Sequence, residues 1–508
     1  MTPGAFELLI VGGGINGAGI ARDAAGRGVR TLLVDKGDFG GATSSASTKL
    51  IHGGLRYLEH YEFRLVTESL AEREVMLRLA PHLVAPLRFV MPHVPTLRPA
   101  WMIRAGLWLY DHIGGRSSLP PSRGIALHSD GFGVGLKPEL KRGFAYSDTR
   151  VDDARLVILN LRSAADQGAT LLPRTRLVAA RRKAGLWRAT LASASAGQQQ
   201  EVTARVLVNA AGPWVDRVLA CTGGEMKNAR VRLIKGSHIV VPRIHAGDHA
   251  YILQNSDRRI VFIIPFLDRW SLIGTTEVSV DSADAGWEIG GEETRYLIEA
   301  ANRYLARPIA EADIVWSFAG IRPLYDDGTG DPAAITRDYT LSLDDREGAV
   351  QLAVFGGKLT TYRNLAETVM QRLEPWLQTA RGPWTAKAPL PGGDFDPARR
   401  EDALQRLCGS YPELPADVLV SLFSRHGTLT GSLLGDAQIP ADLGRHFGGN
   451  LYRIEIDYLT QYEWATTAED ILWRRTKSGL AMTTAERVDF TVWFSTYMKG
   501  NRNRCPTT

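Results

Sequence analysis

The chain has 508 residues, 44% of them hydrophobic and 23% charged, a composition that is typical of a folded globular protein and excludes a disordered or fibrous one. Because a single hydrophobic core stops growing at about 250–300 residues, this length predicts roughly two or three cores. The formal net charge of +5 and the pI near 9.0 suit an anionic substrate, an anionic membrane surface or nucleic acid equally well.

Cysteine usage and the apolar runs bear on location. Cys221, Cys408 and Cys505 lie far apart, and no Cys/His cluster has the spacing of a zinc site, so we expect neither a disulfide framework nor a metal. The N-terminal residues lack the basic start and cleavage site of a signal peptide. No apolar run approaches the roughly 18–20 residues that span a bilayer. We therefore expect a cytoplasmic protein that can lie on a membrane surface but not cross it.

The N-terminal segment is predicted to form a βαβ unit, with strands over Phe6–Val11 and Arg30–Asp35 and a helix over Asn16–Arg27. Between the first strand and the helix lies the motif Gly12-x-Gly14-x-x-Gly17. Such glycines let the backbone turn tightly and approach a pyrophosphate at the helix N-terminus, while Asp35 can accept hydrogen bonds from ribose hydroxyls. The unit predicts dinucleotide binding but does not separate NAD from FAD.

Further elements follow in chain order. A helix is predicted from Asp152 towards Gln167, because its acidic start suits the helix dipole. A hairpin is predicted at the turn 267–269, between two apolar runs. A late strand ends at Gly356-Gly357 and a helix over Leu359–Leu373 follows it. The other predicted strands are Thr170–Leu172, Leu177–Ala180, Leu186–Leu191, Val202–Asn209, Ile260–Phe266, Trp270–Thr275 and Val350–Phe355.

A segment rich in proline and glycine, residues 389–393, marks a domain boundary. We therefore predict one region over residues 1–388 and a second over 389–508. The second region has a helical pattern almost to its end. Thr466-x-x-Glu469 is predicted to be a capping box that starts one of its helices.

Residues 43–58 combine hydroxyls, glycines and basic side chains. One interpretation is that Thr43, Ser44 and Ser45 wrap the second half of a dinucleotide, near its pyrophosphate and its redox-active ring. The other is a solvated Ser/Thr loop ahead of an ordinary helix. The residues alone leave both interpretations open.

Long blocks of sequence resemble the aerobic, FAD-dependent glycerol-3-phosphate dehydrogenases of bacteria, and they run over essentially the whole chain. The blocks are residues 42–65, 98–104, 146–156, 232–242, 273–277, 320–323, 335–340 and 355–363. The resemblance implies an α/β (α+β) fold. Its parts are a glutathione-reductase-type FAD-binding βαβ domain, an interleaved substrate domain on an antiparallel sheet, and a C-terminal α-helical domain.

The resemblance also implies non-covalent FAD as the cofactor. Asn209-Ala-Ala-Gly-Pro-Trp214 ends a strand in a tight turn that suits a path beside the cofactor. The expected FAD-binding residues are Gly12, Gly14, Ile15, Asn16, Gly17, Asp35, Lys36, Thr43, Ser44, Ser45, Lys49, Leu50, His52, Ala211, Gly212, Trp214, Gly357, Lys358, Leu359 and Thr360.

The implied reaction is the oxidation of sn-glycerol 3-phosphate to dihydroxyacetone phosphate. A small dianion requires cations of defined geometry, and the expected substrate-binding residues are Arg56, Tyr57, Arg322, Arg337 and Lys358. Arg322 and Lys358 are also expected to act in catalysis. A base with a pKa near the working pH must take the hydroxyl proton, and either His52 or His238 suits this role. A hydrogen-bonded core histidine is the alternative for both.

Electrons in this family pass to a membrane quinone such as ubiquinone, so a peripheral position on the inner face of the cytoplasmic membrane is expected. The stretch Arg98–Tyr110 mixes Trp, Tyr, apolar and Arg residues, which suits either an interfacial helix or a helix packed inside the protein. An oxidase that makes hydrogen peroxide, a non-catalytic flavin module and a nicotinamide enzyme are the rival hypotheses. A homodimer is left open, and nucleic-acid binding has only the net charge in its favour.

Overall fold

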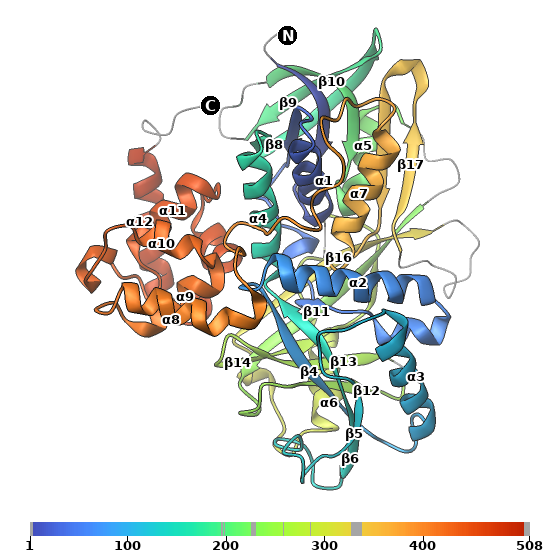
Figure 1. The fold of residues 1–508 in the computed structure, drawn as a ribbon, viewed down its shortest axis with the longest axis vertical. Helices are drawn as coiled ribbons and strands as arrows, with labels where there is room; N and C mark the ends of the chain where they lie inside the picture. The colour runs from blue at the N-terminus through green and yellow to red at the C-terminus, as the bar shows by residue number, and fades with distance from the viewer. Residues whose placement is uncertain are drawn as a thin grey trace.

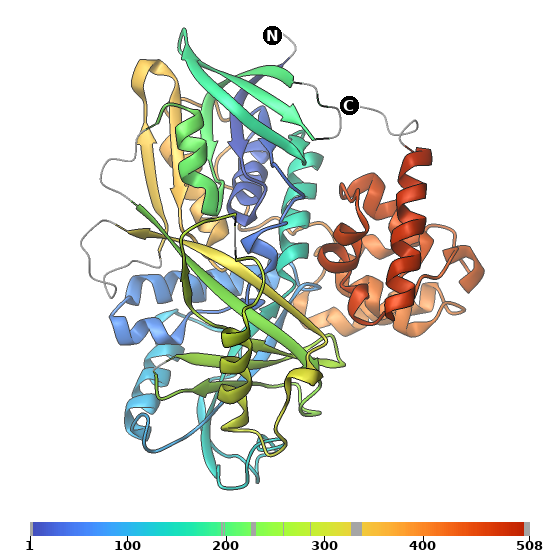
Figure 2. The ribbon, with the colours of Figure 1, turned by 180° about the vertical axis from the view of Figure 1, so that it is seen from behind.

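The computed structural model describes residues 4–194, 197, 199–224, 230–257, 259–284, 286–326 and 338–501. Two β-sheets form the body of the molecule, and a helical region made from the end of the chain lies beside the first sheet (Figure 1). The view from behind shows the same arrangement, with the helical region again to one side (Figure 2).

The first sheet has eight strands, of which β1, β2, β7, β10 and β18 run parallel. The inner strand β1 is apolar on both faces over residues 8–11. Helices α1, α4 and α7 cover one face of it, and the β8–β9 hairpin covers the other. The bounds are β1 (Ala5–Val11), β2 (Thr31–Val34), β7 (Thr170–Leu172), β8 (Thr175–Lys183), β9 (Leu186–Ser193), β10 (Gln199–Asn209), β17 (Thr340–Asp344), β18 (Val350–Phe355), α1 (Ile15–Gly26), α4 (Asp153–Asp166) and α7 (Tyr362–Leu373). The predicted βαβ unit is confirmed as β1–α1–β2.

The second sheet has ten strands and is mostly antiparallel. Helix α6 packs on one face of it, and α2 and α3 pack on the other. The bounds are β3 (Leu50–Ile51), β4 (Val84–Pro92), β5 (Arg123–Ala126), β6 (Arg142–Val151), β11 (Arg230–Pro242), β12 (Ala250–Gln254), β13 (Ile260–Phe266), β14 (Trp270–Gly274), β15 (Val278–Val280), β16 (Trp316–Asp326), α2 (Phe63–Leu79), α3 (Ala100–Ile113) and α6 (Gly291–Asn302). The predicted hairpin is confirmed as β13–β14. The chain alternates between the two sheets, as the interleaved fold predicts.

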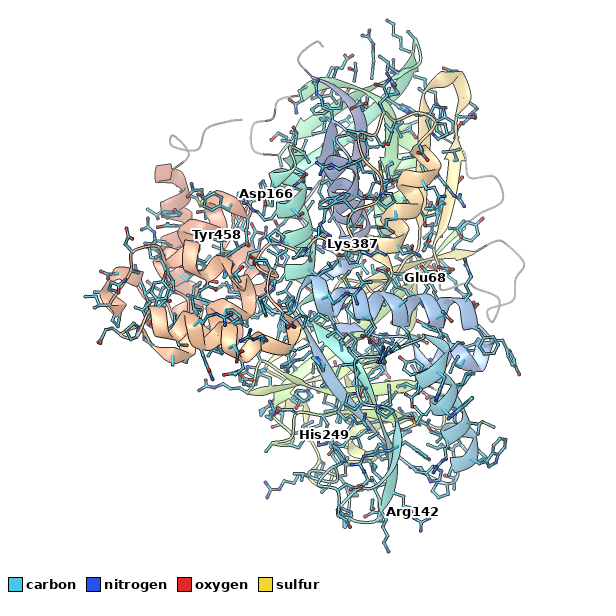
Figure 3. All side chains as sticks on the ribbon, in the orientation of Figure 1. Glu68, Arg142, Asp166, His249, Lys387 and Tyr458 are labelled. Carbon is cyan, nitrogen blue, oxygen red and sulfur yellow. The ribbon has the colours of Figure 1, made fainter. Side chains whose placement is uncertain are left out.

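The helical region contains α8 (Arg400–Ser410), α9 (Ala416–His426), α10 (Leu429–Leu434), α11 (Arg453–Tyr462), a π-helical segment (Asp470–Arg475) and α12 (Thr484–Asn501). It docks on α4 through buried ion pairs, in which Arg155 of α4 binds Glu463 and Lys477 binds Asp152. Figure 3 places Asp166 of α4 and Tyr458 of α11 on the facing sides of the two parts.

Several sequence-based boundaries are wrong by one to three residues; β10, for example, begins at Gln199 and not at Val202. The helix predicted from Leu359 begins at Tyr362, because Gly356 and Gly357 have φ of 73° and 96° and the chain needs a further turn before it becomes helical. The capping box lies one residue later than predicted. The N–H of Asp470 donates to the hydroxyl of Thr467, and the N–H of Thr467 donates to the carboxylate of Asp470. It opens the π-helical segment Asp470–Arg475.

Candidate active site

A cavity of about 1490 Å³ is lined by residues of both sheets, and residues of the helical region line it on one side. Its walls include most of the predicted site residues: Gly12, Gly14, Ile15, Asn16, Asp35, Lys36, Thr43, Ser44, Leu50, His52, Arg56, Tyr57, Ala211, Gly212, Trp214, His238, Arg322, Gly357, Lys358, Leu359 and Thr360. The other described residues of the predicted site, Gly17, Ser45 and Lys49, lie behind this lining. Arg337 lies outside the described residues.

The turn between β1 and α1 is packed so closely that only glycine fits. Gly12 has φ of 113°, and a Cβ on it would lie 2.4 Å from the carbonyl oxygen of Ala210. A Cβ on Gly17 would lie 1.9 Å from the carbonyl oxygen of Gly12, which explains a glycine outside the cavity lining. The backbone can therefore approach a ligand closely at the N-terminus of α1, where the helix dipole favours a pyrophosphate.

Asp35 stands at the end of β2 and accepts hydrogen bonds from the N–H groups of Gly13 at 2.6 Å and Gly37 at 2.7 Å. Burial raises the pKa of Asp35, and these two hydrogen bonds oppose the rise. The carboxylate is held in place before any ligand arrives. Opposite it, the buried Oδ1 of Asn16 has no hydrogen-bond partner among the described residues. The unpaired Oδ1 of Asn16 can accept a hydrogen bond from a ligand, and the glycine turn leaves room for one, so both features fit a bound dinucleotide.

The hydroxyl-rich segment is a braced wall rather than a solvated loop. The hydroxyl of Thr43 donates to the carbonyl of Ile321 at 2.6 Å, and that of Ser44 accepts from the N–H of Ile15 at 2.9 Å. Ser45 donates to the carbonyl of Ala42. The ammonium of Lys49 lies 2.8 Å from Asp153 and is buried, so its charge supports the wall from behind.

At the end of the cavity next to Asp35, the Lys36 ammonium lies 3.4 Å from the ring centroid of Trp214, and the indole N–H of Trp214 donates to Asp284 at 2.9 Å. Ala211 and Gly212 continue the wall after β10. These residues form a partly apolar slot next to Asp35. Such a slot suits a purine ring whose ribose reaches the carboxylate.

The end of the cavity near His52 carries a second group of cations, in addition to those near Asp35. The Lys358 ammonium lies 3.6 Å from the ring centroid of Tyr57. The Arg322 guanidinium is 3.5 Å from Glu277 and donates to the carbonyl of Thr276 at 3.3 Å. Arg56 lines the same end. The chain thus gathers positive charge from three separated segments at one place, which suits a small anion.

Both candidate histidines lie at the cationic end, and both are neutral near pH 7. Burial lowers the pKa of His52, with the charge of Asp148 raising it and that of Lys358 lowering it again. Burial also places the pKa of His238 well below its usual range, and the charges of Lys49 and Arg322 lower it further. A neutral imidazole can accept a proton.

The two histidines differ in how they are held. His238 is fully buried, its Nε2 shares a hydrogen bond of 3.0 Å with Thr48, and its ring stacks on Phe318 at 4.9 Å. His52 is half-buried and its backbone bonds the hydroxyl of Thr360 at 3.3 Å. His52 is therefore the more exposed of the two side chains.

The buried carboxylate of Asp148 holds the loop after His52 through a hydrogen bond from Gly53. Asp148 of β6 accepts from the N–H of Gly53 at 3.4 Å, from Arg73 at 2.9 Å and from the hydroxyl of Tyr110 at 2.7 Å. A Cβ on Gly53 would lie 2.6 Å from the Tyr110 hydroxyl, so a larger residue at this position would displace a neighbouring side chain.

Sequence reasoning missed several lining residues. Thr275 and Glu277 stand in a block that carried the family resemblance, and that block was the signal for them. Asp470 and Arg474 reach the cavity from the helical region, and their only local signal was a helix start. Among the described residues, His, Cys, Asp and Glu side chains form no group of three or more that could hold a metal ion.

The fold and this cavity define a flavoprotein-like oxidoreductase, and comparison with known proteins agrees. Residues 7–363 match the family described as FAD dependent oxidoreductase. Residues 383–490 match the C-terminal domain of alpha-glycerophosphate oxidase. The chain belongs to the FAD-dependent oxidoreductase family, and its cofactor is FAD.

Individual relatives cover nearly the whole chain. A glycerol-3-phosphate dehydrogenase of Pseudomonas aeruginosa is 53% identical over 95% of this chain and 94% of its own length. The aerobic glycerol-3-phosphate dehydrogenase of Escherichia coli is 48% identical over 97% of each chain, and a D-erythritol 1-phosphate dehydrogenase of Brucella abortus is 48% identical over 97% and 98%. The solved structure of a Bacillus halodurans glycerol-3-phosphate dehydrogenase complexed with FAD is similar with a TM-score of 0.74, at 25% identity over 98% of this chain and 95% of that one. The resemblance recognised in the sequence is confirmed.

Proposed function

We propose that the chain oxidises sn-glycerol 3-phosphate to dihydroxyacetone phosphate. The observation that carries the proposal is the gathering of Arg56, Arg322 and Lys358 beside neutral His52 in one cavity. A phosphate dianion matches the cations, and a secondary alcohol needs a base next to it. The names of the Pseudomonas and Escherichia relatives support the same substrate.

In the proposed reaction, Arg56, Arg322 and Lys358 bind the phosphate. His52 accepts the proton of the carbon-2 hydroxyl as the hydride leaves carbon 2, so that a ketone forms. FAD, when bound by the residues around Gly12, Asp35 and Ser44, supplies the hydride acceptor. His238 is the alternative base, but its stacked and buried ring gives it less freedom to reach a ligand.

Electron transfer to a membrane quinone is part of the proposal, and the surface of α3 supports it. Trp101, Met102 and Trp108 of α3 are 70%, 46% and 62% exposed, while Ile103 and Leu107 are buried. One face of α3 therefore packs against the protein, while its exposed face carries large apolar side chains, which is the pattern of an interfacial helix. Among the described helices, none is long and apolar enough to cross a membrane. We propose peripheral attachment to the cytoplasmic face through this surface.

Anaerobic mixing of the purified protein with substrate tests the function. Glycerol 3-phosphate should bleach the flavin absorption within the turnover time, whereas glycerol should bleach it far more slowly because the cations lack their anion. D-erythritol 1-phosphate is the second substrate to mix, because the Brucella relative is named for it. Faster bleaching by D-erythritol 1-phosphate would show that glycerol 3-phosphate is not the preferred substrate. If neither phosphate bleached the flavin, the proposal would be wrong.

The yield of hydrogen peroxide distinguishes an oxidase from the proposed quinone-linked dehydrogenase. The helical region matches the C-terminal domain of an oxidase, so oxygen is the rival acceptor. During turnover in air the proposal expects little hydrogen peroxide, and fast reoxidation when a soluble quinone is added. One peroxide per glycerol 3-phosphate consumed, with no gain from quinone, would assign the chain as an oxidase.

A further inference from the structure

The wall of the cavity at its adenosine side is completed by the C-terminal helical region. Thr467, Glu469, Asp470 and Arg474 line the cavity together with Asp38 and Arg174 of the first sheet's loops. The dinucleotide motif lies more than four hundred residues earlier in the chain. The cavity is therefore open on this side unless the helical region is docked.

A buried ion cluster forms this part of the wall. Arg474 lies 2.6 Å from Asp38 and 2.6 Å from Asp470. Arg475 lies 2.6 Å from Asp38, and Arg174 lies 2.8 Å from Asp470. The side chains of Asp38 and Asp470 are 3% and 0% exposed, so these charges interact at low dielectric.

Glu469 also lines the cavity and lies 3.7 Å from Arg474, so the three arginines of this cluster face three carboxylates. For Asp470, burial acts against ionisation, but the charges of Arg174 and Arg475 lower its pKa to about 2. Buried ion pairs of this kind join the helical region to the loop that contains Asp38, and removing one partner leaves a buried charge unpaired.

The same cluster is fixed to the loop that is expected to hold the ribose. Asp38 lies three residues after Asp35. The N–H of Arg174 donates to the carbonyl of Gly37 at 2.8 Å, and the N–H of Thr175 donates to the carbonyl of Asp35 at 2.7 Å. Any shift of the helical region therefore pulls on the loop between β2 and the hydroxyl-rich wall.

We propose that the C-terminal helical region is part of the FAD site, with Arg474 as the residue that joins it to the loop after Asp35. The inference rests on the FAD assignment and on no particular substrate. Because the region touches the cofactor cavity and docks through the same side chains, FAD binding stabilises its docking, and docking raises the affinity for FAD by the same factor. Separate ion pairs to α4 keep the region attached when this contact is weakened.

The experiment measures FAD release from the holoenzyme by the rise in flavin fluorescence after dilution. Arg474→Ala should release FAD about tenfold faster or more, since a charge-assisted contact is lost. Arg474→Lys should restore part of the retention. The matched control is Arg445→Ala, because Arg445 belongs to the same region and lies 2.6 Å from Asp489 in a pair that is about half-exposed and away from the cavity.

Release from Arg474→Ala within twofold of the wild-type rate, with helix content unchanged, would overturn the proposal. Equal acceleration by Arg474→Ala and Arg445→Ala would also overturn it, because the effect would then come from general loosening. Should Arg474→Ala fail to fold, the comparison of Arg474→Lys with wild type decides. Substrate-driven bleaching is not used, so a wrong substrate leaves the result intact.

Discussion

His52→Asn should slow anaerobic flavin reduction by about 10²–10⁴-fold, which is the usual contribution of a general base. Asparagine can replace the ring without burying a charge. The backbone of His52 keeps its contact with the Thr360 hydroxyl, and the N–H of Gly53 keeps Asp148. The FAD content and the temperature of unfolding should therefore stay near those of the wild type.

The pH dependence gives the sharper signature. Burial lowers the pKa of His52 below 6.5, with Asp148 opposing and Lys358 reinforcing the shift. His52 is thus neutral and active at pH 7, and the wild-type rate should fall only as the pH drops through this lowered pKa. Asp148→Asn removes a charge that raises the pKa, so the fall should move to still lower pH. The His52→Asn rate should vary less with pH, because the titrating base is gone.

The assay is stopped-flow bleaching of the flavin by saturating glycerol 3-phosphate, between pH 5 and 9, with His238→Asn as the matched control. A His52→Asn rate within a few-fold of wild type would refute the reasoning. If His238→Asn carries the large loss and the altered pH profile, His238 is the base. A loss shared equally by both variants, with unchanged profiles, would mean that neither residue takes the proton.

Other predictions concern the phosphate, the membrane and the cofactor turn. Arg322→Ala and Lys358→Met should each lower kcat/KM for glycerol 3-phosphate by about 10–150-fold, with glycerol hardly affected, which steady-state assays measure. Replacing Trp101 and Trp108 together by serine should weaken sedimentation with anionic vesicles and leave bleaching in solution unchanged. Gly17→Ala should abolish FAD loading, since its Cβ would lie 1.9 Å from a backbone carbonyl oxygen, and the absorption of the purified protein will report it.

The parts of the fold that local chemistry determines were predictable from the sequence. The β1–α1–β2 unit and the β13–β14 hairpin follow from apolar runs broken by turn residues, and both are present where expected. Helix α7 was placed three residues early, because the positive φ of Gly356 and Gly357 is set by packing against Asn16 and Asp338. The domain boundary after residue 388 and the roles of the site residues stay predictions.

Long-range electrostatics could not be predicted in this way. Lys49 was expected near the cofactor, yet its ammonium is buried against Asp153, a partner 104 positions away. Asp148 under the His52 loop and Arg474 in the cavity wall depend on contacts 95 and 436 positions apart. No periodicity or spacing marks such pairs, because they form only when the two sheets and the helical region have packed.

One last prediction concerns the effect of the cations on His52, because their charge lowers the pKa of the base that the reaction needs. The charge of Lys358 depresses the pKa of His52 in the free enzyme. A bound phosphate dianion offsets that charge, so His52 should be more basic in the substrate complex. Because kcat/KM reports the free enzyme and kcat the complex, the acid limb of kcat should lie at higher pH than that of kcat/KM. Lys358→Met should move the acid limb of kcat/KM to higher pH, so that the acid limbs of kcat/KM and kcat lie closer together. Coincident limbs in the wild type would show that the phosphate does not tune the base.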